Sequence, residues 1–174
     1  MSKYPSADRL RSLRSDATPD GGVSGVPSVD DISAGSTGIP EIEYDEDHLR
    51  DLRELLAPTK LRLLQQILAT DWGSLSAREL AYRNPELTES TIRDHLRAMA
   101  DRERPFVVQL EADTKQKGVP WKYYAVTEYG IELLKEADMY EGISVLYQAY
   151  QAMERTDEIR RIEEFTHRPT PDWL

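Results

Sequence analysis

The stretch LTESTIRDHLRAMADRERPFVVQLEADTKQKGVPWKYYAV, residues 87–126, holds two hydrophobic patterns in succession. Its first part repeats apolar residues at intervals of three and four, which indicates an amphipathic helix. Its second part has two apolar runs of strand length around a Gly-Val-Pro turn, which indicates a β-hairpin. We therefore expect a helix at about residues 88–103 and a hairpin at about residues 106–126.

The expected helix has a capping residue and one apolar face. Thr88 precedes it and is of a type that accepts the first free backbone N–H groups of a helix. Ile92, Leu96 and Met99 follow at positions i, i+4 and i+7 and form the face that we expect to be buried. The polar residues between them therefore fall on the other faces of the helix.

Two further helices are expected before this one. The segment TKLRLLQQILAT, residues 59–70, carries a stripe of Leu and Ile at helical spacing. The segment SARELAYRN, residues 76–84, starts with Ser76 and has Glu79 three residues later, which is a capping-box pattern. Pro85 ends this helix, because proline disfavours helical geometry in the residue before it.

Composition divides the chain into four parts. Residues 1–44 are rich in Ser, Asp, Gly, Pro and Thr without periodicity, so we expect a disordered acidic tail. Residues 45–137 hold the helices and the hairpin, residues 138–166 add C-terminal helices, and residues 167–174 form a second tail. The expected fold class is mainly α with a small β-hairpin (α+β).

The formal net charge of −10 is unevenly distributed. Residues 57–127 carry 11 basic and 9 acidic side chains, a net charge of +2, whereas residues 1–56 and residues 128–174 each carry −6. A locally basic segment is compatible with a polyanionic partner. The chain has no Cys, and its three His lie far apart, so we expect neither a metal site nor a cofactor.

Two phrases resemble a known family. LTESTIRDHLRAM, residues 87–99, is similar to the third-helix signature of the winged helix-turn-helix transcription regulators of bacteria and archaea, most of all the ArsR, MarR and PadR-like types. WKYYAVTEYGIELL, residues 121–134, is similar to their second wing strand with its Tyr-x-Val-Thr-x-x-Gly pattern. The resemblance covers roughly residues 55–137, and the acidic, Cys-free, Arg-over-Lys composition resembles haloarchaeal proteins.

The resemblance implies binding to double-stranded DNA, with the helix at residues 88–103 in the major groove. Ser90 and Thr91 in its first turn can bond a phosphate or a base. Arg93 is the candidate for bidentate contact with guanine, and Arg97 for contact with phosphate. The resemblance also implies that the hairpin is the wing. Its lysines are then expected to contact the DNA backbone or minor groove; they are Lys115, Lys117 and Lys122.

Other interpretations remain open at this point. Arg93 and Arg97 could pair with Glu89, Asp94 or Asp101 on a solvated face. The domain could then be a winged-helix protein-interaction module that uses its acidic faces and does not bind DNA. An enzyme is not expected, because the sequence has no nucleophile–base pair, no phosphate-binding Gly-rich loop and no set of metal ligands.

The segment GISVLYQAYQAMER, residues 142–155, has one apolar-aromatic helical face. In the resembling families, helices outside the winged core commonly form the dimer, which implies a homodimer here. The same face could instead cover its own domain. A membrane span and a signal peptide are absent, so we expect a cytoplasmic protein, and nothing marks an effector. The candidate dimer residues are Ile143, Leu146, Tyr147 and Tyr150.

Overall fold

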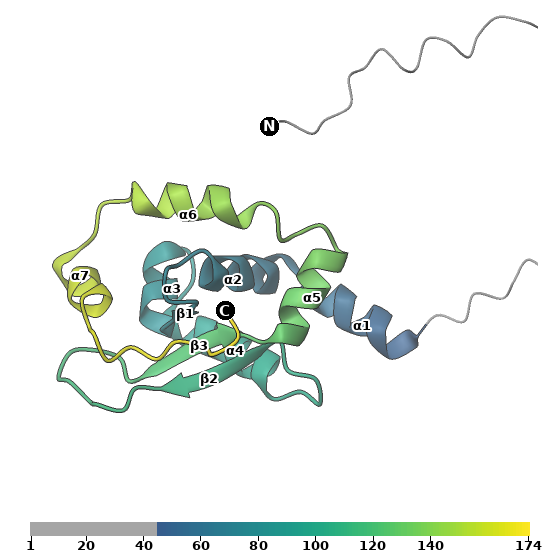
Figure 1. Ribbon diagram of the computed structural model, residues 1–174, viewed down its shortest axis with the longest axis horizontal. Helices are drawn as coiled ribbons and strands as arrows, with labels where there is room; N and C mark the ends of the chain where they lie inside the picture. The colour runs from purple at the N-terminus through teal and green to yellow at the C-terminus, as the bar shows by residue number, and fades with distance from the viewer. Residues whose placement is uncertain (1–44) are drawn as a thin grey trace, which may run out of the picture. The chain divides into compact units, whose positions relative to one another are not determined.

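The computed structural model describes residues 45–174, so the tail predicted at residues 1–44 lies outside the described residues. Helices pack around a small antiparallel sheet (Figure 1), which confirms the expected fold class. In chain order the elements are α1 (Glu46–Leu55), α2 (Pro58–Leu68), β1 (Ser74–Leu75), α3 (Ala77–Arg83), α4 (Glu89–Ala100), β2 (Val107–Glu111), β3 (Lys122–Val126), α5 (Glu128–Glu136), α6 (Ile143–Gln151) and α7 (Asp157–Glu163).

The two capped helices begin where the sequence predicts. The Ser76 hydroxyl accepts from the backbone N–H of Glu79 at 3.3 Å, and the Glu79 carboxylate accepts from the backbone N–H of Ser76 at 2.9 Å, which completes a capping box at α3. Thr88 caps α4 by accepting from the backbone N–H of Thr91 at 3.1 Å. Because α3 and α4 are joined by a short turn and pack on each other, they form the expected helix-turn-helix.

α4 ends at Ala100, three residues before the predicted end. The residues that follow turn toward α1, where Arg102 forms an ion pair with Asp51 and the Arg104 guanidinium lies 2.9 Å from the same carboxylate. Burial raises the pKa of Asp51, but the Tyr129 hydroxyl and the two arginines outweigh it, so the pKa stays below its usual value. These contacts hold α1 against the end of α4. The chain therefore leaves the helix after Ala100 instead of adding another helical turn.

The wing is an antiparallel hairpin of β2 and β3. Its register runs from Val107 opposite Val126 to Glu111 opposite Lys122. β3 also pairs on its other edge with β1, so the sheet has the order β1-β3-β2. The sequence did not predict β1, because two residues are too few to show an alternating pattern.

The core lies where α2, α4 and α5 meet the sheet. The α4 residues Ile92, Leu96 and Met99 are all fully buried, as their spacing predicts. α5 packs so tightly that a Cβ at Gly130 would lie 2.7 Å from the carbonyl oxygen of Phe106. Glycine is therefore required at this position of the Tyr-x-Val-Thr-x-x-Gly pattern.

The C-terminal segment, residues 164–174, packs on the winged domain instead of leaving it (Figure 1). Phe165 is buried in a small cluster with Val119 and Tyr123 of the wing. The indole N–H of Trp173 donates to the carbonyl oxygen of Val126 at 2.9 Å. The wing is therefore supported from behind by Phe165, at the end of the predicted C-terminal helices, and by Trp173, in the predicted tail.

A buried ion pair fixes the same segment to the helix-turn-helix. The Nη2 atom of Arg168 lies 2.9 Å from both carboxylate oxygens of Glu79 and donates its hydrogen bond to Oε2. It also donates to the carbonyl oxygen of Ser74 at 2.6 Å. Only 1% of the Arg168 side chain and 3% of the Glu79 side chain are exposed, so water does not screen this pair.

Candidate nucleic-acid interface

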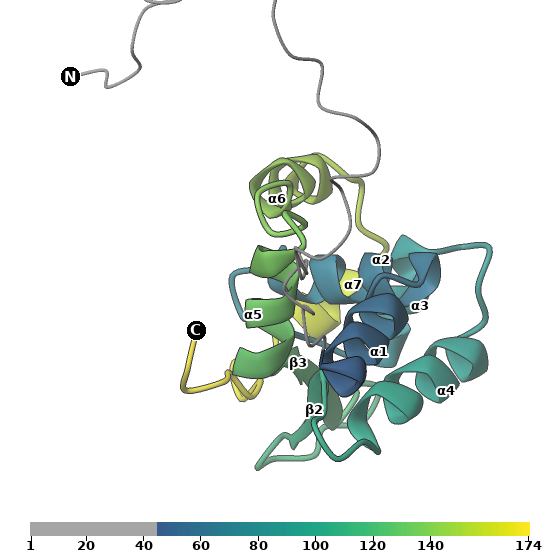
Figure 2. The same ribbon diagram turned by 90° about the vertical axis from the view of Figure 1, so that its right-hand side faces the viewer.

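A groove of about 240 Å³ separates the start of the helix-turn-helix from the wing. Figure 2 shows α4 running beside β2 and β3, so helix and wing lie next to each other. The groove joins side chains from α3, α4 and β3 in one concave surface, which we call the wing groove. Its lining residues are Ser76, Ala77, Arg78, Glu89, Arg93, Pro120, Trp121, Lys122 and Tyr124.

The first turn of α4 carries two hydroxyl groups that differ in their exposure to solvent. Ser90 is exposed. Thr91 is half-buried, and its Oγ1 lies 2.8 Å from the Oγ1 of the capping residue Thr88. Ser90 is therefore the more accessible of the two predicted contact residues.

Both predicted arginines on α4 have acidic neighbours on the same helix. The Arg93 Nη2 atom lies 2.8 Å from Glu89 Oε1, and the Arg97 Nη1 atom lies 3.9 Å from Asp94 Oδ1. The side chains of Arg93 and Arg97 remain 52% and 69% exposed. Such exposed pairs contribute little to stability, so both guanidinium groups can exchange partners at low cost.

Arg93 lines the wing groove together with Tyr124 of the wing strand. Burial raises the pKa of the Tyr124 hydroxyl, and the positive charges of Arg97 and Arg93 lower it in part. The Tyr124 hydroxyl donates to the Gln109 side chain at 3.4 Å. Neither Tyr124 nor Gln109 was predicted as a site residue, since their strand pattern fits the sheet alone.

Two of the three wing lysines lie over one aromatic ring. The Nζ atoms of Lys115 and Lys122 lie 4.2 Å and 4.8 Å from the centre of the Trp121 ring. Lys117 is exposed beside Gly118, whose φ of 83° makes the predicted turn. An aromatic face positions ammonium groups without neutralising their charge, so these cations remain able to attract an anion.

Arg78 is a basic residue of the wing groove that the sequence did not reveal. Its Nε atom lies 3.8 Å from Glu89, and its Nη1 atom lies 3.1 Å from Glu158 of α7. Arg78 and Glu158 are 80 residues apart, so only the fold brings them together. Glu89 thus lies between two arginines, Arg78 on α3 and Arg93 on α4.

α6 lies on the outside of the molecule in both ribbon views (Figures 1 and 2) and has no fully buried residue. The Tyr147 hydroxyl donates to Asp71 at 2.6 Å, and the Arg83 guanidinium lies 4.3 Å from the centre of the Tyr150 ring. Both tyrosines therefore face their own chain, whereas Val145 is 66% exposed. The other two candidate dimer residues, Ile143 and Leu146, are half-buried.

Among residues 45–174, no group of three or more His, Asp or Glu side chains could hold a metal ion. None of the described helices combines the length and the apolar character that crossing a membrane requires.

Comparison with known proteins gives one informative result. No protein-family model and no curated protein matches the chain. A solved structure does match: a protein with a GntR superfamily winged-helix-turn-helix domain from Halomicrobium mukohataei, at 41% sequence identity and a TM-score of 0.66. The match covers 73% of this chain and 89% of that protein.

This result confirms the winged helix-turn-helix that the sequence resembled, while the ArsR, MarR or PadR type is not confirmed. The GntR superfamily is not one of the three types that the sequence resembled. Its winged helix-turn-helix domain is nevertheless the fold that those types imply. At this level of identity and coverage, the chain belongs to the GntR superfamily of winged helix-turn-helix proteins.

Proposed function

We propose that the protein is a sequence-specific transcription regulator that binds double-stranded DNA through α4 and the wing. The winged fold and the GntR-superfamily neighbour support this function. In this mode the first turns of α4 enter the major groove, where Ser90, Thr91 and Arg93 meet base edges. The wing lies on the adjacent backbone or minor groove.

The observation that carries the proposal is the wing groove itself. Arg78, Arg93 and Lys122 come from three different elements and line one concave surface. In the proposed binding mode, the DNA strand beside α4 would run along this surface. Its phosphates would meet these three cations, with Arg97 and the lysines around Trp121 on either side.

Binding requires the arginines to exchange their carboxylate partners for phosphate or base atoms. At an ionic strength of about 1 M the Debye length is only about 3 Å, so remote acidic side chains hardly repel DNA. We propose a haloarchaeal protein that acts under such conditions, with its acidic flanks screened. Glu89 and Asp94 then matter because they lie in direct contact with the arginines.

We further propose that the protein acts as a homodimer through α6. Ile143 and Leu146 of this helix are only half-buried, and Val145, on the opposite side of the helix from Ile143, is 66% exposed. A two-fold dimer would place two copies of α4 about one turn of DNA apart, roughly 34 Å. The preferred DNA site would then be palindromic.

The test starts from a pool of random DNA duplexes, from which the full chain selects its preferred sequence. Fluorescence anisotropy then compares this duplex with a scrambled duplex over a salt series. Replacing both Lys115 and Lys117 with Glu should weaken binding to the two duplexes alike, because these side chains meet only the backbone. Arg93→Ala should reduce mainly the preference between them, by about 1–3 kcal/mol.

Lys135→Glu is the matched control, because Lys135 is an exposed lysine on α5 outside the wing groove. It should change binding less than the wing substitutions do. If neither Arg93→Ala nor the double lysine substitution alters binding, the DNA-binding surface lies elsewhere.

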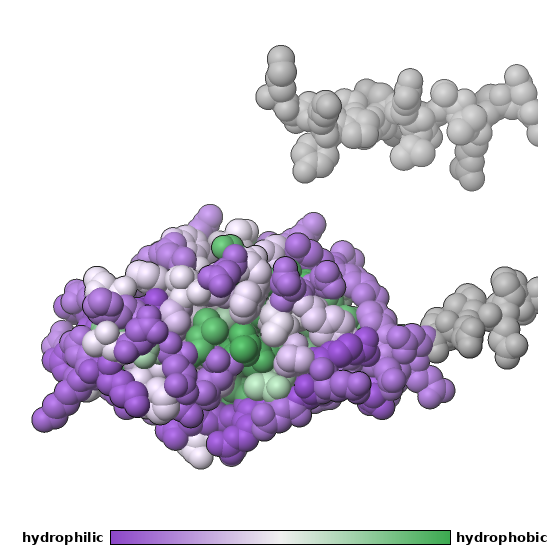
Figure 3. Space-filling model, turned by 60° about the horizontal axis from the view of Figure 1, so that its bottom comes forward, coloured by the Kyte–Doolittle hydropathy of each residue, from purple (hydrophilic) through white to green (hydrophobic). Residues whose placement is uncertain are grey.

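Absence of DNA binding at every salt concentration would favour the alternative, a winged-helix module that binds protein. Two observations speak for this alternative. Glu89 and Asp94 already accompany the arginines of α4. Figure 3 also shows a face on which hydrophilic residues surround a hydrophobic area, a pattern that protein-binding surfaces often have.

A further inference from the structure

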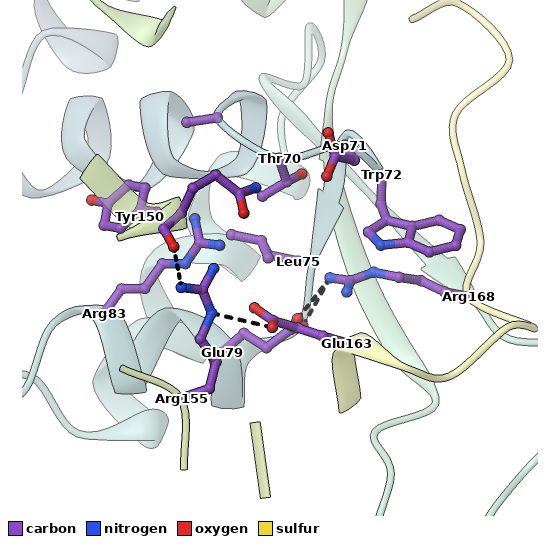
Figure 4. A pocket seen from close by; sticks show the side chains of 12 residues that line it. Thr70, Asp71, Trp72, Leu75, Glu79, Arg83, Tyr150, Arg155, Glu163 and Arg168 are labelled. Atoms are coloured by element: carbon purple, nitrogen blue, oxygen red, sulfur yellow. Dashed lines mark hydrogen bonds and ion pairs between the residues drawn. The ribbon is translucent and has the colours of Figure 1, made fainter. Parts of the chain in front are cut away.

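A second cavity, of about 210 Å³, lies among the α2–β1 connection, α3, the end of α6, α7 and the C-terminal segment (Figure 4). Glu79 and Arg83 are four residues apart on α3 and therefore belong to one face of that helix. We call this space the arginine cavity, because Arg83, Arg155 and Arg168 all line it.

Two of these three arginines already have a carboxylate partner. Arg155 lies 3.3 Å from Glu163, and Arg168 forms its buried pair with Glu79 (Figure 4). Within residues 45–174, no ion pair joins Arg83 to a carboxylate. The cavity thus contains one guanidinium group that forms no ion pair with any carboxylate among the described residues.

Arg83 is held in place by neutral groups. Its Nη1 atom donates to the carbonyl oxygen of Gln66 at 3.2 Å, and its guanidinium lies over the Tyr150 ring. Burial lowers the pKa of Arg83, and the charges of Glu79 and Glu163 oppose this effect only in part. A partly buried cation without a paired anion has lost hydration, and an anion bound beside it would offset that loss.

The remaining carboxylate of the cavity does not supply that anion. Asp71 lies at the exposed edge and accepts from the Tyr147 hydroxyl at 2.6 Å. Its partner is therefore a neutral group on α6, and its charge faces the solvent. A ligand that enters the cavity would find Arg83 as the cation with free capacity.

The cavity also has apolar walls. Leu75 and Ala69 are buried at its base, and the Trp72 ring forms part of its side. Its volume exceeds the cavity of about 150 Å³ that accepts benzene in a well-studied protein. We propose that the arginine cavity binds a small organic monocarboxylate, whose carboxylate pairs with Arg83 and whose apolar body lies against Leu75 and Trp72.

Calorimetric titration of the full chain in the absence of DNA tests this proposal. Three acids, benzoate, phenylacetate and nicotinate, are each compared with their amides, which have nearly the same shape and no charge. At least one acid should bind about tenfold more tightly than its amide, because only the carboxylate pairs with a guanidinium. Arg83→Met should abolish that preference.

Arg62→Met is the matched control, because the exposed Arg62 pairs with Glu86 at the surface, outside the cavity. It should leave the preference for the acid unchanged. If Arg83→Met does not fold, the Nε–H signal of Arg83 in nuclear magnetic resonance spectra of the unaltered protein should shift with the acid and not with the amide.

The proposal is overturned if none of the three acids is preferred over its amide, or if folded Arg83→Met retains the preference. Because DNA takes no part in these titrations, their outcome is independent of whether the wing groove binds DNA.

Discussion

Glu79 combines two structural tasks in one buried carboxylate. Its Oε2 atom accepts from both the backbone N–H and the hydroxyl of Ser76, which closes the capping box of α3. The same oxygen accepts from Arg168. A buried charge is tolerated when it is paired and hydrogen-bonded, so the start of the helix-turn-helix depends on a residue from the C-terminal segment.

Removal of Arg168 alone should therefore strongly destabilise the protein. Arg168→Met keeps the length of the side chain but leaves the Glu79 carboxylate buried without its cation. We expect the free energy of unfolding in urea to fall by about 3–5 kcal/mol. The double variant Glu79→Gln with Arg168→Met should recover much of this loss, because glutamine still closes a capping box without a charge. A loss below about 1 kcal/mol for Arg168→Met would mean that the pair acts like an exposed one.

Only one half of this arrangement could be predicted from the sequence. Ser76 and Glu79 are three residues apart, so the capping box is a local pattern that can be recognised from the sequence alone. Arg168 follows Glu79 by 89 residues and lies between a His and a Pro in a segment without periodicity. No local pattern specifies such a contact, since it results from the path of the whole chain.

At the level of elements, α4 combines a fully buried apolar face with a charged outer face. The buried face follows from its spacing, which is why the existence and start of α4 were predicted correctly. The end of α4 and its neighbours from other elements were not predicted. Asp51 of α1 pairs with Arg102 just after α4, and Arg78 of α3 and Tyr124 of β3 lie on other elements of the chain. The candidate site was therefore predictable on α4 and the wing, but not on α3.

Glu89 should limit the affinity of α4 for DNA. Its carboxylate lies between Arg78 and Arg93 and would approach phosphate when DNA enters the wing groove. Glu89→Gln should raise affinity for all DNA sequences by about three- to tenfold at low salt, and the gain should shrink as salt increases. Anisotropy titrations with the selected and scrambled duplexes would measure this.

Glu132→Gln serves as the control for this prediction, because it removes the same charge from the exposed surface of α5. An equal gain from Glu132→Gln would show that net charge, and not the position of Glu89, sets the affinity.

At the level of the whole molecule, α6 is the helix with the least burial. It packs on α2 through one side, and it has no fully buried residue among its nine. Val145 points outward, and Met139 and Met153 on either side of the helix are also exposed. These exposed apolar side chains are the part of α6 through which we propose that a second copy binds.

Val145→Glu should therefore separate the proposed dimer into monomers. A charge at the centre of an apolar contact loses its hydration without gaining a partner. Light scattering coupled to size-exclusion chromatography should give about half the mass of the unaltered protein, while Gln116→Glu, at the exposed tip of the wing, should leave the mass unchanged. If the unaltered protein is already a monomer at micromolar concentration, α6 does not form a stable dimer.

The contact between Glu79 and Arg168 also bears on how the protein is made. During synthesis on the ribosome, the part of the chain that forms both helices and the wing emerges well before residue 168 does. Until then, Glu79 has no cation to accompany it into the interior, and Phe165 does not yet support the wing. The winged domain should thus reach its final stability only late in translation, so a nascent chain paused after residue 137 would remain open to proteases and chaperones.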